Sequence, residues 1–302
     1  MTDKYLIVVA GPTAVGKTEL CLRLAEALNT DIISADSRQF YRELSIGTAK
    51  PSAEELARVP HHFINSHSIA EEYSAGDFER DTLQLLNTLF KDKDCVVMTG
   101  GSGLYIKAVC EGLDDLPRSQ PGLREELMLR LREDGLELLQ NEILHIDPEF
   151  SATAEFSNPQ RVVRALEVFY SSGRTISSFH LDQKPPRPFN QILVALDRDR
   201  AELYQRIEQR MDQMLAAGLE EEARGVIDFR SHNALKTVGY KEVFGYLDGE
   251  YDRTEMIRLL KQNSRRYAKR QLTWFKHQGD FNWFDADDYQ GVLSLVLDQM
   301  NR

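Results

Sequence analysis

The chain has 302 residues, of which 42% are hydrophobic and 28% are charged, and its formal net charge is −11. This length and apolar content suit one large globular domain or two smaller ones. The negative charge, taken as an average, argues weakly against a nucleic-acid-binding protein, and three cysteines without C-x-x-C spacing suggest neither a disulfide framework nor a zinc site.

The first residues predict a strand rather than a targeting segment. Residues 5–10 are apolar, and nothing before them has the basic and apolar series of a signal peptide. No apolar run in the chain approaches the ~20 residues that a helix needs to cross a bilayer. We therefore expect a cytoplasmic protein without a membrane partner.

A glycine-rich loop follows this strand. Its sequence reads G-x-x-x-x-G-K-T and leads into a helical pattern from Glu19 to Ala25, which is the context that predicts a phosphate-binding P-loop rather than a helix-capping turn. The loop N–H groups and the helix dipole favour an anion, Lys17 adds a positive charge, and the Thr18 hydroxyl can bind Mg²⁺. The loop alone suggests ATP as the ligand. The predicted diphosphate- or nucleotide-binding residues are Gly11, Pro12, Thr13, Ala14, Val15, Gly16, Lys17 and Thr18.

Asp36 follows a second predicted strand at 31–34. In open α/β sheets, ligands bind at the carboxyl ends of the strands, so Asp36 can face the P-loop. It is a candidate general base or metal-binding carboxylate. On position alone, a helix-capping aspartate is an equally good interpretation.

A further strand is predicted at 95–98 and runs into the glycine-rich turn around Ser102. P-loop ATPases usually carry a Walker-B aspartate at the end of such a strand, but here Thr99 and glycines stand at that place. The turn N–H groups and the Ser102 hydroxyl can instead bind a second anionic group.

The pattern becomes helical and charged from about Leu116, with no strand signal. Helices are predicted at 123–132, at 135–145 and after the Asn158-Pro159 capping pair. A proline-rich linker at 184–188 closes the segment, and an apolar strand at 191–196 returns to the sheet. We therefore predict an α/β fold: a P-loop NTPase-like parallel sheet flanked by helices, with a core domain at 1–116 and 190–302 and an all-helical insertion domain at 117–189.

The end of the chain is basic although the whole is acidic. Between Arg230 and Lys276 there are eleven Lys or Arg and five Asp or Glu, and the last long helix, at about 254–277, has seven bases and no acid from Arg258 onward. Such a run favours a phosphate backbone as partner. On the preceding helix Arg206 and Arg210 lie one turn apart and can reach one phosphate, although Glu202 is an equally good partner for Arg206.

Six ordered motifs together resemble the bacterial tRNA dimethylallyltransferases of the IPP transferase family, over nearly the whole chain. The P-loop is common to many families, whereas the ordered set is specific. The motifs are Gly11–Thr18, Asp36–Gln39, Ile46–Pro51, Gly100–Tyr105, Asn158–Glu167 and Ala268–Phe275.

The resemblance implies that a dimethylallyl group is transferred from dimethylallyl diphosphate to N6 of adenosine 37, in tRNAs that read codons starting with U. Asp36 is then the general base. Lys17, Thr18 and Arg210 complete the catalytic set around the departing diphosphate, with Mg²⁺ as cofactor at Thr18. No Walker-B acid is needed, because the bound phosphates are the leaving group rather than the group transferred.

The resemblance also implies contacts with the anticodon stem-loop of tRNA, and we expect a monomer. At three of the positions the chain departs from the family, which often has Thr in place of Ser102 and Arg in place of Lys236 and Lys241, so a bidentate contact by the two lysines is in doubt. The implied tRNA-binding residues are Asp36, Ser37, Arg38, Gln39, Ser102, Arg124, Gln160, Arg161, Val162, Val163, Arg164, Lys236, Lys241, Lys269 and Arg270.

Three alternatives remain open. An adenylate isopentenyltransferase shares the P-loop and the aspartate but needs neither the helical insertion nor the basic helix. A small-molecule kinase would use ATP and direct the carboxylate at a hydroxyl group. A nucleotide-regulated RNA-binding module would have no chemistry and would tolerate loss of Asp36.

Overall fold

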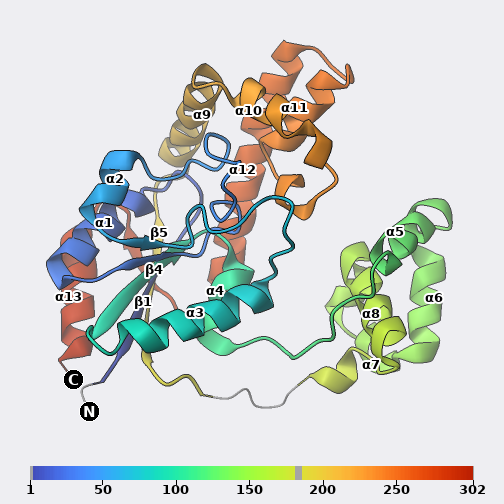
Figure 1. Ribbon diagram of the computed structural model, residues 1–302, viewed down its shortest axis with the longest axis horizontal. Coiled ribbons are helices and arrows are strands. Elements are labelled where there is room, and N and C mark those ends of the chain that lie inside the picture. Colours follow the sequence, from blue (N-terminus) through green and yellow to red (C-terminus); the bar gives the residue numbers. More distant parts are fainter. Residues whose placement is uncertain (1–2, 181–185, 302) are drawn as a thin grey trace. The chain divides into compact units, whose positions relative to one another are not determined.

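The computed structural model describes residues 3–180 and 186–301 (Figure 1). The chain divides into two compact units, a core unit of Met1–Glu111 with Pro186–Arg302 and an insertion unit of Gly112–Pro185. These bounds differ from the predicted domain bounds by at most five residues. Part of the predicted proline-rich linker, Lys184 and Pro185, lies outside the described residues.

A parallel sheet forms the centre of the core unit, and the predicted fold class is confirmed. Among the described residues it has six strands in the order β3-β2-β4-β1-β5-β6. The central strand β1 pairs along its whole length with β4 and β5. The strands are β1 (Tyr5–Ala10), β2 (Ile32–Ser34), β3 (His61–His62), β4 (Cys95–Gly100), β5 (Asn190–Asp197) and β6 (Asn282–Asp285).

Helices cover both faces of this sheet, because successive side chains of a buried strand point to opposite faces. Ile7 and Val9 pack with residues of α1 (Lys17–Leu28) and α13 (Tyr289–Met300). Leu6 and Val8 pack on the other face with α3 (Ala75–Leu89) and α4 (Gly103–Glu111) (Figure 1). The carboxyl ends of the strands therefore remain for loops, among them the P-loop after β1 and Asp36 after β2. A short helix α2 spans Ala53–Arg58.

A third apolar cluster joins the C-terminal helices of the core unit to the loop around Leu44. The long α12 buries Met256, Leu260, Ala268 and Phe275. None of the helices within the described residues is long and apolar enough to cross a membrane. The helices of this part are α9 (Arg200–Ala216), α10 (Leu219–Gly225), α11 (Tyr240–Leu247) and α12 (Arg253–His277).

Within its described residues, all secondary structure of the insertion unit is helical, and the unit has an apolar core of its own. Asn158 caps α8 as predicted, its side chain accepting a hydrogen bond from the Gln160 N–H at 3.0 Å. Buried Asp147 joins two segments by accepting hydrogen bonds from the N–H groups of Phe150 and Ser177. The helices are α5 (Leu123–Glu133), α6 (Leu136–Ile146), α7 (Pro148–Ser151) and α8 (Pro159–Ser172).

Candidate active site

The P-loop connects β1 to α1 and turns sharply before the helix. Gly16 caps α1 with φ of 121°, a conformation that favours glycine, and the cap has no side-chain hydrogen bond. The first N–H groups of α1 are thus left without a capping side chain, as a site for a phosphate group requires. Thr13 differs, because its N–H donates to the Gln271 side chain at 2.9 Å.

Lys17 lies across the mouth of this loop. Its Nζ donates to the carbonyl oxygens of Gly11 at 2.9 Å and Pro12 at 2.8 Å. Burial lowers the pKa of Lys17 to about 8; the negative charge of Asp36 opposes this shift and the positive charge of Arg210 adds to it. An incoming diphosphate would therefore meet a desolvated ammonium group that already points into the loop.

Asp36 lies at the carboxyl end of β2 beside the P-loop, as predicted. Its Oδ1 accepts a hydrogen bond from the Arg38 N–H at 3.0 Å. Its side chain lines a cavity together with Lys17 and Thr18. The other oxygen of the carboxylate has no hydrogen-bond or ion-pair partner within the described ranges, so it is available to accept a proton or to approach a metal ion.

The turns that follow β2 and β4 are joined by hydroxyl groups. Ser102 Oγ accepts a hydrogen bond from the Ser37 N–H at 3.0 Å and donates to Ser37 Oγ at 3.1 Å. The two predicted tRNA-binding serines thus lie next to Asp36 and hold its turn. Ser102 does not stand free to bind a second anion.

Arg210 reaches the same region from α9. Burial lowers the pKa of Arg210, while the charge of Asp36 raises it. In the part of the chain that the structure describes, its guanidinium has neither a carboxylate partner nor a hydrogen bond. Arg206, one turn earlier, instead donates from Nε to the Ala14 carbonyl at 2.9 Å, and Glu202 pairs with Arg198. Of the two arginines, Arg210 is therefore the one left for a ligand.

Two residues of α12 complete the surroundings and were missed in the sequence. Gln271 Nε2 donates to the Gly101 carbonyl at 2.9 Å, so its amide ties the P-loop to the turn after β4. Burial and the Asp36 charge raise the pKa of Tyr267 to about 12, and Arg270 Cζ lies 5.7 Å from the centre of its ring. A polar residue at a buried helix position was the available signal for Gln271.

The basic run of α12 is less free than its sequence indicates. Carboxylates from other segments pair with Lys261 and Arg265, at Asp212 and Glu208 of α9. Arg258 pairs with Glu255, and Lys276 lies 3.7 Å from Asp197.

Four predicted tRNA contacts of this region remain available. Lys269 and Arg270 on α12, and Lys236 and Lys241 before and within α11, are exposed. None of them has a carboxylate partner within residues 3–180 and 186–301. The positive surface is therefore narrower than the seven bases of the sequence indicated.

Gln39 is used inside the protein. Its Nε2 donates to the carbonyl oxygens of Thr48 at 3.3 Å and Ala49 at 3.2 Å, and its Oε1 accepts from the Ser34 hydroxyl at 3.0 Å. The side chain lines the same cavity as Asp36. Its hydrogen bonds make it a brace of the site, and the predicted contact with tRNA stays a prediction.

In the insertion unit the predicted tRNA-binding residues fall into two groups, polar side chains and two valines. The polar side chains are tied to one another or exposed. Arg124 pairs with buried Glu167 at 2.8 Å and donates to Gln160 at 3.0 Å, and Arg164 lies 3.6 Å from the same carboxylate. Arg161 is exposed on the same helix.

The valines between these arginines differ, because the side chains of Val162 and Val163 are fully buried in the apolar core of the unit. Neither valine therefore offers its side chain to tRNA in this structure, and the predicted contact at these two positions stays a prediction. Only their main chain remains for the predicted role.

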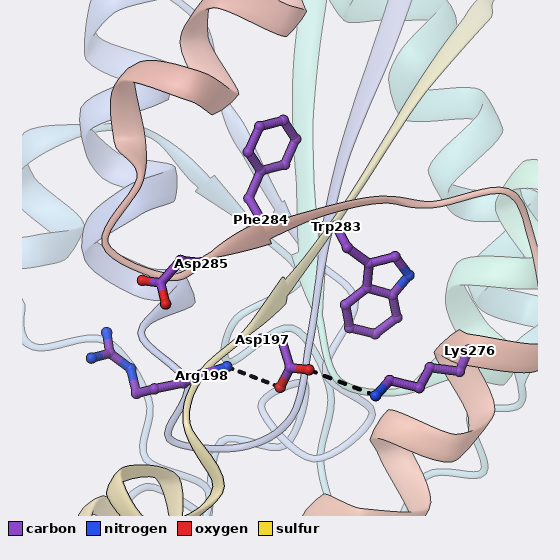
Figure 2. Close-up of a pocket in the computed structure, with 6 residues that line it drawn as sticks. All are labelled: Asp197, Arg198, Lys276, Trp283, Phe284 and Asp285. Atoms are coloured by element: carbon purple, nitrogen blue, oxygen red, sulfur yellow. Dashed lines mark hydrogen bonds and ion pairs between the residues drawn. The ribbon is translucent and has the colours of Figure 1, made fainter.

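A separate pocket lies where β5 and β6 end (Figure 2). The charged groups of this pocket pair with one another. Asp197 accepts a hydrogen bond from the Arg198 N–H and faces Lys276. The Lys276 Nζ lies 5.5 Å from the centre of the Trp283 ring. No predicted site residue lines this pocket, so it is not part of the candidate active site.

Comparisons with known proteins identify the family of this chain. A family model described as IPP transferase matches residues 39–278. A tRNA dimethylallyltransferase of Cytophaga hutchinsonii is 53% identical, with 97% of each chain covered, and one of Christiangramia forsetii is 49% identical, with 99% of each covered.

Solved structures give the same result. The full-length tRNA isopentenylpyrophosphate transferase of Bacillus halodurans matches with a TM-score of 0.74 at 36% identity, over 99% of this chain and 97% of that one. A eukaryotic dimethylallyltransferase acting on tRNA matches with a TM-score of 0.80 at 26% identity, over 98% of this chain and 77% of that one. The resemblance found in the sequence is thereby confirmed, and the chain belongs to the IPP transferase family.

Proposed function

We propose that this protein is a tRNA dimethylallyltransferase, which transfers a dimethylallyl group from dimethylallyl diphosphate to N6 of adenosine 37 in tRNAs that read codons starting with U, and releases diphosphate. Relatives that match this chain over nearly their whole length are named tRNA dimethylallyltransferase. The observation that carries the proposal is the placement of one carboxylate, Asp36, among two desolvated cations, Lys17 and Arg210, at the P-loop.

The cations suit a diphosphate leaving group. As the bond between C1 of the dimethylallyl group and the diphosphate oxygen breaks, negative charge grows on the diphosphate. Lys17, Arg210 and the N–H groups at the start of α1 are placed to stabilise that charge in a site with little water. Catalysis by this part of the site is therefore electrostatic.

Asp36 suits the other half of the reaction. The N6 amine of adenine forms the new bond to C1 and must lose a proton, which the Asp36 carboxylate accepts. Arg38 holds one carboxylate oxygen through its N–H, so the other oxygen is directed by the same turn. The adenine must leave the anticodon stack to reach this position, as in other enzymes that modify a base.

The donor groups present also fit Mg²⁺, which prefers oxygen ligands and keeps several waters. Thr18 Oγ lines the cavity and would hold the ion together with diphosphate oxygens. When bound, Mg²⁺ supplies positive charge that neutralises the diphosphate. The Thr18 hydroxyl and the loop N–H groups orient that diphosphate.

The end of β4 argues against the kinase alternative. Thr99 stands where a Walker-B aspartate would bind the metal of a nucleoside triphosphate, and its hydroxyl donates to the Val9 carbonyl at 3.0 Å. The P-loop is therefore supported as a cradle for a diphosphate that leaves. The insertion unit and the exposed bases Lys269 and Arg270 favour tRNA over a free nucleotide as acceptor.

A labelled-substrate experiment tests the proposal. The protein is incubated with Mg²⁺ and dimethylallyl diphosphate labelled in the dimethylallyl group, in separate reactions with tRNA, AMP or ADP, and a parallel reaction contains γ-labelled ATP. We expect label in tRNA only, lost when adenosine 37 is replaced by guanosine. Label in AMP or ADP would identify the adenylate isopentenyltransferase, and transfer from ATP would identify a kinase.

A further inference from the structure

Glu222, on α10, makes an unusual set of hydrogen bonds with a distant loop. Its Oε2 accepts from the N–H groups of Ser45 at 2.8 Å and Ile46 at 2.8 Å, and its Oε1 accepts from the Gly47 N–H at 2.9 Å. Three successive N–H groups form a concave site for an anion, and here a carboxylate of the same protein fills it. The carboxylate thereby fixes the main chain of the 45–50 loop.

Tyr240 holds this arrangement from the other side. Its hydroxyl donates to Glu222 Oε1 at 2.6 Å, and burial together with this hydrogen bond raises the pKa of Tyr240, so the hydroxyl stays protonated. Its fully buried ring lies against Gly47, where an added Cβ would come within 2.6 Å of the ring. We name this unit of Glu222, Tyr240 and Gly47 the Glu222 latch.

The latched loop reaches the active site through its carbonyl groups. Thr48 and Ala49 accept the two hydrogen bonds of the Gln39 amide. Gln39 Oε1 in turn accepts a hydrogen bond from the Ser34 hydroxyl. The Ser34 oxygen accepts a hydrogen bond from the main-chain N–H of Asp36, at 3.4 Å. The main chain of residues 45–49, together with these hydrogen bonds, therefore connects Glu222 to the main chain of Asp36.

We propose that Glu222 is a positioning residue for prenyl transfer: through the Glu222 latch and Gln39 it fixes the main chain that aims the Asp36 carboxylate. This role rests on the proposed function. Glu222 touches neither the P-loop nor Lys17, so it acts on the proton-accepting half of the site. Removing it should slow the chemical step and leave diphosphate binding unchanged.

Glu222→Gln is the informative change because it keeps the shape of the side chain. An amide NH₂ in place of Oε2 would meet the N–H groups of Ser45 and Ile46. If the NH₂ instead takes the place of Oε1, it meets the Gly47 N–H, while the Tyr240 hydroxyl can turn and accept a hydrogen bond from the NH₂. Either orientation leaves at least one N–H of the loop without an acceptor, so the loop must shift.

The test measures the rate of single-turnover prenyl transfer to tRNA at saturating substrate concentrations. The affinity for tRNA, the affinity for Mg²⁺ with inorganic diphosphate, and the thermal unfolding of each variant are measured alongside. For Glu222→Gln we expect a rate about 10- to 100-fold lower, the size typical of a misplaced catalytic group, with both affinities within about twofold. The matched control is Glu221→Gln, the same change of charge at an exposed neighbour on α10, and it should leave the rate unchanged.

Two further variants show whether the effect passes along the loop. Gly47→Ala places a methyl group against the Tyr240 ring and leaves the Glu222 charge in place, so it should lower the rate to a similar extent. Combining Glu222→Gln with Gln39→Ala should cost little more than the worse single change, because both break the same connection. If Glu222→Gln fails to fold, Gly47→Ala and its combination with Gln39→Ala decide.

The opposing outcomes are distinct. An unchanged rate, a loss of tRNA affinity alone, or fully additive effects of Glu222→Gln and Gln39→Ala would overturn the positioning role. Wild-type protein that transfers no label to tRNA would refute the proposed function instead, and the latch would then have no reaction to serve.

Discussion

The negative charge of Asp36 acts on two buried cations, Lys17 and Arg210, at the mouth of the P-loop. The two cations are desolvated, which lowers the pKa of both, and the single carboxylate opposes that shift. A polyanionic ligand would restore the missing counter-charge. The site is therefore matched to a substrate that brings negative charge with it.

At the scale of single residues, Asp36→Ala should separate binding from chemistry. We expect tRNA and diphosphate affinities within a few-fold of wild type and a loss of prenyl transfer of ~10²-fold or more, the usual contribution of a general base. Single-turnover kinetics with filter binding measure both quantities. Equal losses of affinity and rate would make Asp36 a residue that positions tRNA.

The pKa of Lys17, lowered to about 8, predicts a pH dependence of ligand binding. Below this pH the ammonium is charged and binds diphosphate fully. Above it the free protein loses the proton that the complex requires, so the affinity for Mg²⁺ with inorganic diphosphate should fall by up to about tenfold per pH unit. Calorimetry between pH 6 and 9.5 measures this, and Lys17→Met should remove the fall while leaving any titration of the ligand itself.

At the scale of elements, one face of α12 packs against the active site and another is exposed to solvent. Its buried face supplies Gln271, which joins the P-loop to the turn after β4. On its other side some bases pair with carboxylates of α9, whereas Lys269 and Arg270 remain exposed without such partners among the described residues. We therefore expect tRNA phosphates to bind the exposed bases of α12 that lack a carboxylate partner, and not the paired ones.

Lys269→Ala combined with Arg270→Ala tests this division of α12. The double variant should weaken tRNA binding and reduce the slope of log affinity against log salt by about 1 per lost phosphate contact, with diphosphate affinity unchanged. The control is Arg258→Ala with Lys261→Ala, which removes the same charge from residues already paired with Glu255 and Asp212. Equal salt slopes for the two double variants would contradict the assignment.

At the scale of the whole molecule, the core unit holds the diphosphate machinery and the insertion unit has its own apolar core. Each unit thus has a separate source of stability. Replacing residues 112–185 by a flexible glycine-serine linker should leave a folded core that binds Mg²⁺ with inorganic diphosphate as wild type does. This linker variant should bind tRNA more weakly than wild type and transfer no prenyl group. Retained transfer would show that the insertion unit is dispensable.

Much of the architecture was predictable from the sequence, because it depends on residues that are close together in the chain. The P-loop, the strand before it and the Asn158 cap of α8 rest on residues a few positions apart. The short edge strand β6 was missed, since most of its residues are exposed and show no alternation. Glu222 lies in a run of three glutamates of which nothing in the sequence singles out one.

The sequence by itself determined the phosphate-binding loop, the parallel sheet, the helical insertion and the family, because each depends on local patterns or on the order of motifs. Only the tertiary structure decided which charges are free. It brought Glu208 and Asp212 to the bases of α12, buried Val162 and Val163, left Arg210 unpaired among the described residues, and set Glu222 on the loop beside Gln39. Ion pairing and burial depend on residues far apart in the chain, and no local pattern encodes those distances.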